Sequence, residues 1–107
     1  MAGENQWPDR TGVGEFSIGS NVLPGLSKLA EEAGEVVQVV GKIMGAGGLV
    51  MHWDGSDLAE RLEDEMADLW AALVFVRDTN NLNSERISLR VVEKLRLFSQ
   101  WHKGQGA

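Results

Sequence analysis

Two short acidic motifs carry the chemistry that this sequence offers. Glu32 and Glu35 are three residues apart in the first motif, and Glu65 and Asp68 repeat that spacing in the second. On a helix, residues three apart lie one turn apart on the same side, so each motif presents two carboxylates together. If the two helices pack together, four carboxylates converge with no basic residue in either motif. Like charges at that range stay ionised only with a cation, and an all-oxygen site suits Mg²⁺ or Mn²⁺.

The position of Glu65 distinguishes the second motif from an ordinary charged helix face. A heptad pattern predicts one packed apolar stripe on this helix, and Glu65 takes a place where the pattern favours leucine. A carboxylate in that place is costly unless a partner neutralises it. Glu60, Glu63 and Asp64 instead fit a solvated face. The apolar members of the stripe are Leu58, Leu62, Leu69, Ala72 and Val76.

The first acidic motif is predicted to lie in a helix over about 22–44. Ser20 or Asn21 is a plausible N-cap, and the glycines from Gly45 onward end the helix. Gly34 in the interior costs about 1 kcal/mol relative to alanine, so we expect another helix or a ligand to come close there. The apolar stripe of this helix is Leu26, Leu29, Ala33, Val36, Val40 and Ile43.

Two further helices complete the predicted fold. The second runs from a cap at Ser56 or Asp57 to about Thr79. A turn that begins at Asn80 leads to a third helix, with Ser84 as its cap. The stripe predicted to be buried on this third helix is Ile87, Val91, Leu95, Phe98 and Trp101.

These patterns predict one all-α domain, a bundle of about three main helices per chain that is completed by oligomerisation. A chain of 107 residues makes a modest core, yet 43% of its residues are apolar. The second helix also has Met66, Trp70 and Val74 on another side, as a helix between two neighbours does. The expected organisation is an N-terminal arm over 1–20, the helical domain over 21–102 and a disordered tail over 103–107.

Composition excludes several other classes of protein. The net charge of −6 argues against a surface for nucleic acid polymers, which need basic patches. No cysteine is present, so there are no disulfides and no thiolate metal site. The chain begins without a signal-sequence pattern, and its apolar stretches are too short to span a membrane. We therefore expect a cytoplasmic protein without membrane partners.

The two motifs together resemble those of the MazG-type all-α nucleoside triphosphate pyrophosphohydrolases, whose hallmark is E-E-x-x-E on one helix and E-x-x-D on the next. The matching segments are KLAEEAGE at 28–35 and EMADL at 65–69, and the resemblance covers roughly 26–101. It implies hydrolysis of a (deoxy)nucleoside triphosphate to the monophosphate and pyrophosphate, in nucleotide-pool house-cleaning. It also implies a homodimer or homotetramer with a site completed across the subunit interface. The Mg²⁺ ligands that it implies are Glu32, Glu35, Glu65 and Asp68.

The remaining residues of such a site are open to more than one reading. Glu31 is either a base, a ligand of a second metal ion, or a solvated charge. Phosphates need cations besides the metal, and the candidates are Lys28, Lys42, Lys94 and Arg96, of which Lys28 and Lys94 are preferred. Trp7, Trp53 and Trp101 are candidates for stacking on the base, and Trp53 is preferred.

Two alternatives remain beside this reading. Phosphoribosyl-ATP pyrophosphohydrolases use a related helical acidic site, and a non-catalytic helical oligomerisation module could carry a vestigial acidic cluster. A di-iron bundle is disfavoured, because it needs Glu-x-x-His pairs and the only histidines here are His52 and His102.

Overall fold

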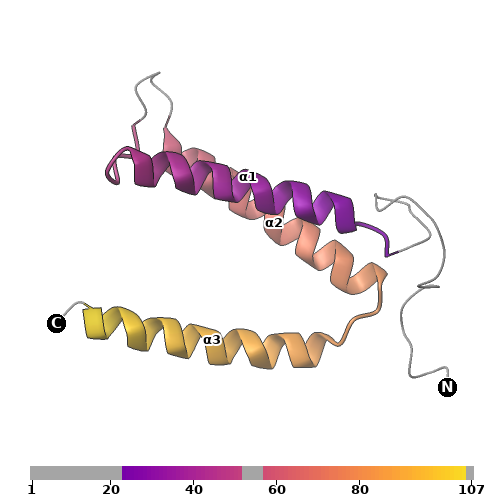
Figure 1. The fold of residues 1–107 in the computed structure, drawn as a ribbon. Helices are drawn as coiled ribbons and strands as arrows, with labels where there is room; N and C mark the ends of the chain where they lie inside the picture. Colours follow the sequence, from indigo (N-terminus) through magenta and orange to yellow (C-terminus); the bar gives the residue numbers. More distant parts are fainter. Residues whose placement is uncertain (1–22, 52–56, 106–107) are drawn as a thin grey trace.

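The computed structural model describes residues 23–51 and 57–105, and its regular secondary structure is helical. It contains α1 (Leu26–Gly45), α2 (Leu58–Thr79) and α3 (Ser84–Gln105). Helices α1 and α2 form an antiparallel hairpin, and α3 turns back and runs beside the hairpin at a distance (Figure 1). Within these ranges the all-α prediction with three helices is confirmed. None of the described helices is long and apolar enough to cross a membrane.

Helix α1 begins several residues later than predicted, because a glycine in a left-handed conformation precedes it. Gly25 has φ of 90° and occupies the N-cap position without a side-chain cap. A Cβ atom at Gly25 would lie 2.7 Å from the ring of Phe75 on α2. Glycine at this position therefore lets the start of α1 pack directly against α2. The caps expected at Ser20 or Asn21 lie outside the described residues.

The end of α1 and both ends of α2 follow the sequence prediction. Helix α1 ends at Gly45, and α2 ends at Thr79. Asp57 is the N-cap of α2, and its Oδ1 accepts hydrogen bonds of 3.0 and 3.1 Å from the amides of Ala59 and Glu60. These bonds satisfy two of the amide donors that a helix start leaves without partners.

The end of α2 is a Schellman motif, in which a left-handed residue closes the last turn. Asn81 has φ of 56°, and the amide of Leu82 donates to the carbonyl of Arg77 over 2.9 Å. The preceding residue, Asn80, is 3% exposed, and its Nδ2 donates to the carbonyl of Pro24 over 3.0 Å. This bond ties the end of α2 to the start of α1 and fixes the direction in which the chain leaves the hairpin.

Helix α3 differs from the prediction at both ends. Its cap is Asn83 rather than Ser84, because the Asn83 Oδ1 accepts a bond of 2.9 Å from the amide of Arg86. Asparagine and serine are comparable caps, so the sequence alone does not choose between neighbours. At its other end the helix continues to Gln105, into the segment 103–107 that was expected to be a disordered tail.

The core between α1 and α2 is small. Its fully buried apolar side chains agree with the predicted stripe on α2 but not on α1, where Val39 is buried and Val40 is 37% exposed. Helix α1 is apolar on more than one side, and α2 covers the side that bears Val39. The buried α2 residues are Leu58, Ala72 and Val76.

The prediction of a buried stripe on α3 is wrong for the single chain. The packing of α1 against α2 is the only extensive helix–helix contact among the described residues. Exposed fractions along the α3 stripe are 40% for Ile87, 50% for Val91, 59% for Leu95, 53% for Phe98 and 55% for Trp101.

Candidate functional site

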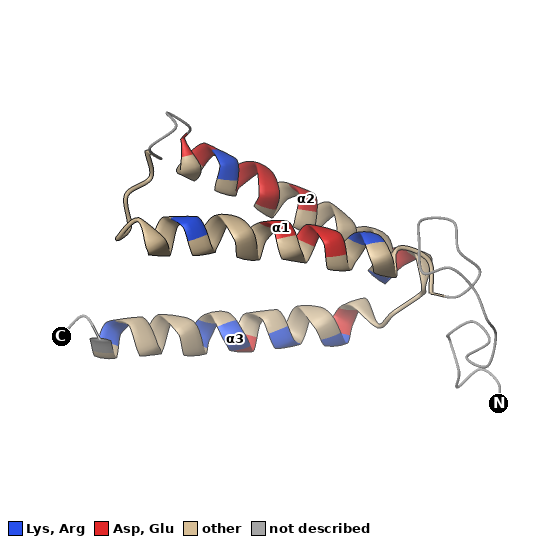
Figure 2. Ribbon diagram, turned by 45° about the horizontal axis from the view of Figure 1, so that its top comes forward, with Lys and Arg blue, Asp and Glu red and all other residues tan. Residues whose placement is uncertain are grey.

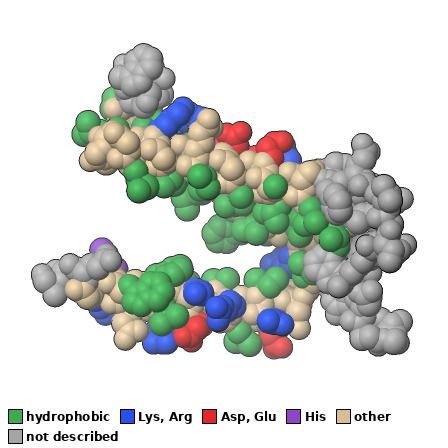
Figure 3. All heavy atoms as spheres, viewed as in Figure 1, with side chains coloured by type: hydrophobic (Ala, Val, Ile, Leu, Met, Phe, Trp, Pro, Cys, Tyr) green, Lys and Arg blue, Asp and Glu red, His purple; other side chains and the backbone are tan. Residues whose placement is uncertain are grey.

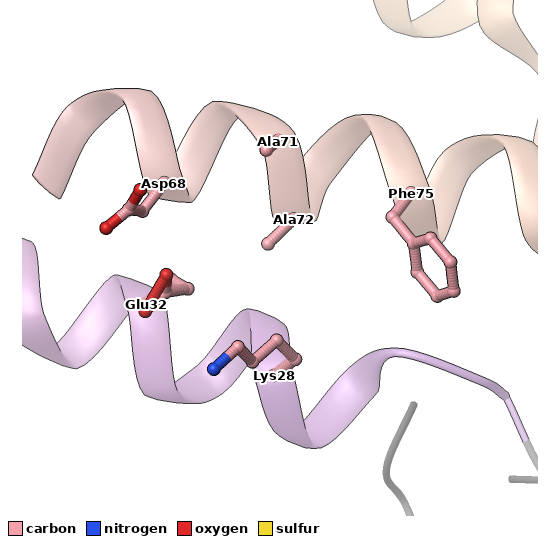
Figure 4. A pocket seen from close by; sticks show the side chains of 6 residues that line it. All are labelled: Lys28, Glu32, Asp68, Ala71, Ala72 and Phe75. Carbon is pink, nitrogen blue, oxygen red and sulfur yellow. The ribbon is translucent and has the colours of Figure 1, made fainter. Parts of the chain in front are cut away.

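Three of the four predicted carboxylates meet across the hairpin. Glu32 of α1 and Glu65 and Asp68 of α2 each offer a carboxylate oxygen, and these oxygens all lie within 4.8 Å of one another. Figure 4 shows Glu32 and Asp68 pointing toward each other from the two helices. Glu32 and Glu65 are half-buried, and Asp68 is exposed. We call these three residues the acidic triad.

The fourth predicted ligand, Glu35, is half-buried on α1 and lies outside this group. Its negative charge nevertheless acts on the triad, since it is among the causes that raise the pKa of Glu65. Glu31 is directed elsewhere: it is exposed and pairs with Lys28, whose Nζ lies 2.8 Å from the Glu31 Oε1. Glu31 is thus separated from the triad, whereas the charge of Glu35 still acts on Glu65.

The pKa of Glu65 is raised above its ordinary value, and its neighbours in the triad contribute to this shift. The largest cause is the partial burial of this carboxylate, followed by the negative charges of Glu35, Asp68 and Glu32. Arg61, one turn earlier on α2, has the opposite effect. Each carboxylate that stays ionised makes the next ionisation less favourable, so this arrangement disfavours the fully charged state without a cation.

Lys28 provides a positive charge beside the triad, although the two acidic motifs themselves contain no basic residue. The pKa of Lys28 is raised, first by its hydrogen bond and attraction to Glu31, while its desolvation acts in the opposite direction. The charges of Glu32 and Asp68 raise it further. Because the Lys28–Glu31 pair is exposed, the ammonium group can exchange Glu31 for another anion at little cost.

An open pocket of about 300 Å³ begins at the triad and continues along the hairpin (Figure 4). Lys28, Glu32 and Asp68 form its polar end, and the ring of Phe75 stands at the other end. Between them the wall consists of the small side chains Ala71 and Ala72, which leave room above the helix surface.

Phe75 is a pocket residue that the sequence analysis missed. The signal that points to it is helical spacing, since Asp68, Ala71, Ala72 and Phe75 follow at intervals of three, four and seven residues and share one side of α2. A search for aromatic candidates among the tryptophans alone overlooks this pattern.

The other predicted substrate-binding residues do not line this pocket. Lys94, Arg96 and Trp101 lie on α3 and Lys42 lies in the last turn of α1, and none of the four lines the pocket. Trp7 and Trp53 lie outside the described residues. The close approach expected at Gly34 also does not occur among the residues that the structure describes, because a Cβ there would meet none of their atoms within 4 Å.

Comparisons with known proteins found no relative of this chain. No protein-family model matches the chain, and neither a curated protein nor a solved structure matches it.

Proposed function

We propose that this protein is a Mg²⁺-dependent nucleoside triphosphate pyrophosphohydrolase, which converts (deoxy)nucleoside triphosphates to monophosphates and pyrophosphate and limits surplus or non-standard nucleotides. The observation that carries the proposal is the acidic triad, three carboxylates from two helices at the end of a pocket that also presents a lysine and an aromatic ring. The resemblance of its two motifs to the MazG-type enzymes supports the same assignment.

The donor set of the triad fits a hard divalent cation. Three carboxylate oxygens within 4.8 Å of one another offer the all-oxygen environment that Mg²⁺ and Mn²⁺ prefer. Glu32, Glu65 and Asp68 would hold the ion, and Glu35, whose charge acts on Glu65, is a further candidate ligand. When bound, the ion would offset phosphate charge and lower the pKa of a water molecule for attack on the α-phosphorus.

The chain's own side chains would bind and orient the substrate. Lys28 would pair with phosphate oxygens beside the triad in place of Glu31, because a polyphosphate carries more negative charge than one carboxylate. The nucleoside would then extend over Ala71 and Ala72, and its base would stack against Phe75. This orientation places the phosphates at the polar end of the pocket and the base at the apolar end.

Glu31 is better suited to positioning than to proton transfer in this scheme. It lies outside the triad and holds Lys28 through an exposed ion pair. We propose that the enzyme acts as a homodimer or homotetramer. Lys94 does not line the pocket of its own chain, so it would reach a site only across a subunit interface.

The activity is tested by measuring Mg²⁺-dependent pyrophosphate release from a panel of ribo- and deoxyribonucleoside triphosphates. We expect release by the wild type, and loss of turnover in Glu65→Gln. Glu63→Gln, on the exposed part of the same helix, is the matched control and should retain activity. Equal turnover by wild type and Glu65→Gln would overturn the assignment.

The same assay separates the two alternatives. Release from phosphoribosyl-ATP but from no nucleoside triphosphate would assign the chain to the related enzyme of histidine synthesis. Absence of release from every substrate would favour the non-catalytic oligomerisation module.

A further inference from the structure

Arg61 of α2 is a basic residue close to the acidic triad that does not line the described pocket. It is half-buried and precedes Glu65 by one helical turn. Its positive charge reaches this carboxylate, because it lowers the pKa of Glu65 against the effect of the acidic neighbours. Arg61 therefore lies within electrostatic range of the triad.

Arg61 shares one side of α2 with the residues of the site. At 100° per residue it falls within an arc of about 80° together with Glu65, Asp68, Ala72 and Phe75. Arg61 and Phe75 are each seven residues from Asp68, which is about 10 Å along the helix axis. The triad thus lies between a basic residue toward the start of α2 and an aromatic residue toward its end.

The two sides of the triad differ in the ligand chemistry that they accept. The pocket extends from the triad toward Phe75, past the methyl groups of Ala71 and Ala72 (Figure 4). This side suits the sugar and base of a nucleotide, and the proposed function places the nucleoside there. With the α-phosphate at the triad, the β- and γ-phosphates then extend in the other direction, toward Arg61.

The hairpin has few other cations for these two phosphates. Helices α1 and α2 carry nine acidic and four basic residues, and Figure 2 shows red segments predominating on the hairpin. Two of the basic residues lie at helix ends: Lys42 is in the last turn of α1, and Arg77, near the end of α2, pairs with Asp78 over 2.8 Å. Lys28 and Arg61 are therefore the basic residues of the hairpin that lie near the triad.

The basic residues of α3 are separated from the hairpin within the chain. Figure 3 shows acidic side chains along the edge of the hairpin away from α3, and hydrophobic side chains along the side that faces α3. Among the described residues, α3 makes no extensive contact with α1 or α2. Within one chain, a cation for the β- and γ-phosphates therefore has to come from the hairpin.

We propose that Arg61 binds the pyrophosphate part of the substrate and stabilises it as it leaves, on the side of the triad opposite to the nucleoside. This inference rests on the proposed function and adds a residue and a direction to it. Water supplies the oxygen of the new bond to the α-phosphorus and releases a proton. The oxygen that bridges the α- and β-phosphorus leaves with the pyrophosphate and keeps the electron pair of the broken bond.

Arginine suits this position because negative charge accumulates on the departing pyrophosphate. A planar guanidinium pairs with two phosphate oxygens at once and stays protonated at neutral pH. A charge that is already in place where the leaving group develops its own stabilises the transition state. Arg61 and Lys28 would then contact different phosphates, with Lys28 on the nucleoside side of the triad and Arg61 on the other.

The inference is tested by titrating pyrophosphate into the full chain in the presence of Mg²⁺, with isothermal calorimetry as a readout that needs no turnover. Arg61→Gln should raise the dissociation constant of pyrophosphate roughly tenfold to hundredfold, the effect of losing charge-assisted hydrogen bonds. Arg61→Lys keeps the charge without the paired geometry, so it should give an intermediate value. Arg77→Gln is the matched control on the same helix and should bind like the wild type, since Arg77 is paired with Asp78.

Binding of Mn²⁺ to the same variants separates an effect on pyrophosphate from an effect on the carboxylates. The Mn²⁺ affinity of Arg61→Gln should not fall below that of the wild type, because all three carboxylates of the triad remain. A parallel loss of Mn²⁺ and pyrophosphate affinity would overturn the inference. If Arg61→Gln loses its helical circular dichroism, the comparison of Arg61→Lys with the wild type decides.

Failure of this inference and failure of the proposed function give different results. Wild-type turnover with equal pyrophosphate affinities of wild type and Arg61→Gln would remove the role of Arg61 and leave the activity in place. A wild type that binds no pyrophosphate would also overturn the role of Arg61. Pyrophosphate binding that depends on Arg61, without turnover of any triphosphate, would support the binding role and remove the proposed activity alone.

Discussion

Gly25 at the start of α1 lies so close to Phe75 on α2 that a Cβ atom on Gly25 would come within 2.7 Å of the aromatic ring. The same ring forms the apolar end of the pocket. A backbone constraint at the helix start and the shape of the candidate site are therefore linked through one side chain.

The first prediction compares Gly25, the N-cap of α1, with Gly34 in the interior of that helix. Gly25→Ala should destabilise the protein by at least about 1–2 kcal/mol, since φ of 90° is strained for alanine and its Cβ meets the Phe75 ring. Gly34→Ala is the control, because its Cβ faces open space within the chain and alanine favours a helix by about 1 kcal/mol. Urea unfolding measures the stability of both variants. Equal changes in the free energy of unfolding would contradict the described packing at Gly25.

The second prediction concerns the bond between the helix ends. Asn80 donates through Nδ2 to the carbonyls of Pro24 and Val76, over 3.0 and 2.9 Å. Asn80→Ala leaves these carbonyls without that donor and should lower the free energy of unfolding by roughly 1–3 kcal/mol. Asn81→Gly, at the next position, should be tolerated because glycine adopts the left-handed conformation readily. Thermal unfolding of the two variants provides the comparison. A melting temperature of Asn80→Ala equal to that of the wild type would contradict the stabilising role of these hydrogen bonds.

The third prediction is a pH dependence of the metal-free protein. The pKa of Glu65 is raised above 4.5 in the folded chain, so between 4.5 and the raised value the native state holds a proton that the unfolded state has lost. The slope of the unfolding free energy with pH is then negative for this group, and its destabilising effect is largest at neutral pH. Removing the charge by Glu65→Gln should therefore stabilise the metal-free protein at pH 7.

The measurement for this pH dependence is urea unfolding of wild type and Glu65→Gln in the presence of a chelator. The difference between the two proteins should shrink as pH falls from 7 toward 4.5. Groups with lowered pKa values, such as Asp78 beside Arg77, affect both proteins equally and cancel in the difference. A difference that is constant over this range would show that Glu65 is not perturbed by its neighbours.

The fourth prediction concerns the cation beside the triad. If Lys28 binds phosphate, Lys28→Ala should lower kcat/KM for the triphosphate roughly tenfold to hundredfold, the effect of losing one charge-assisted hydrogen bond. Lys42→Ala is the control, since Lys42 lies in the last turn of α1 and does not line the pocket. Steady-state kinetics of both variants test this role. Equal losses of kcat/KM in Lys28→Ala and Lys42→Ala would argue against phosphate binding by Lys28.

Much of the hairpin could be predicted from sequence because local patterns determine it. The heptad on α2 places Glu65 beside apolar neighbours, and an aspartate before an apolar run indicates the cap at Asp57. The α3 stripe was predicted correctly as an apolar face but wrongly as buried, because amphipathicity shows that a face needs cover without showing what covers it. The start of α1 at Gly25 depends on a contact with Phe75, fifty residues away in sequence.

The site shows the same division between local and distant information. The spacing within each motif predicts which carboxylates share a helix side, and the structure brings Glu32, Glu65 and Asp68 together. Glu35 stays outside this group although it lies one turn from Glu32 on α1, a difference that the spacing along one helix does not predict.

If the acidic triad holds one divalent cation, Mn²⁺ should bind to the full chain at a single site. Electron paramagnetic resonance of the free ion measures this binding. We expect a saturable site in the wild type and in Glu63→Gln that is lost in Glu65→Gln. Equal Mn²⁺ binding by all three proteins, or none by the wild type, would contradict it.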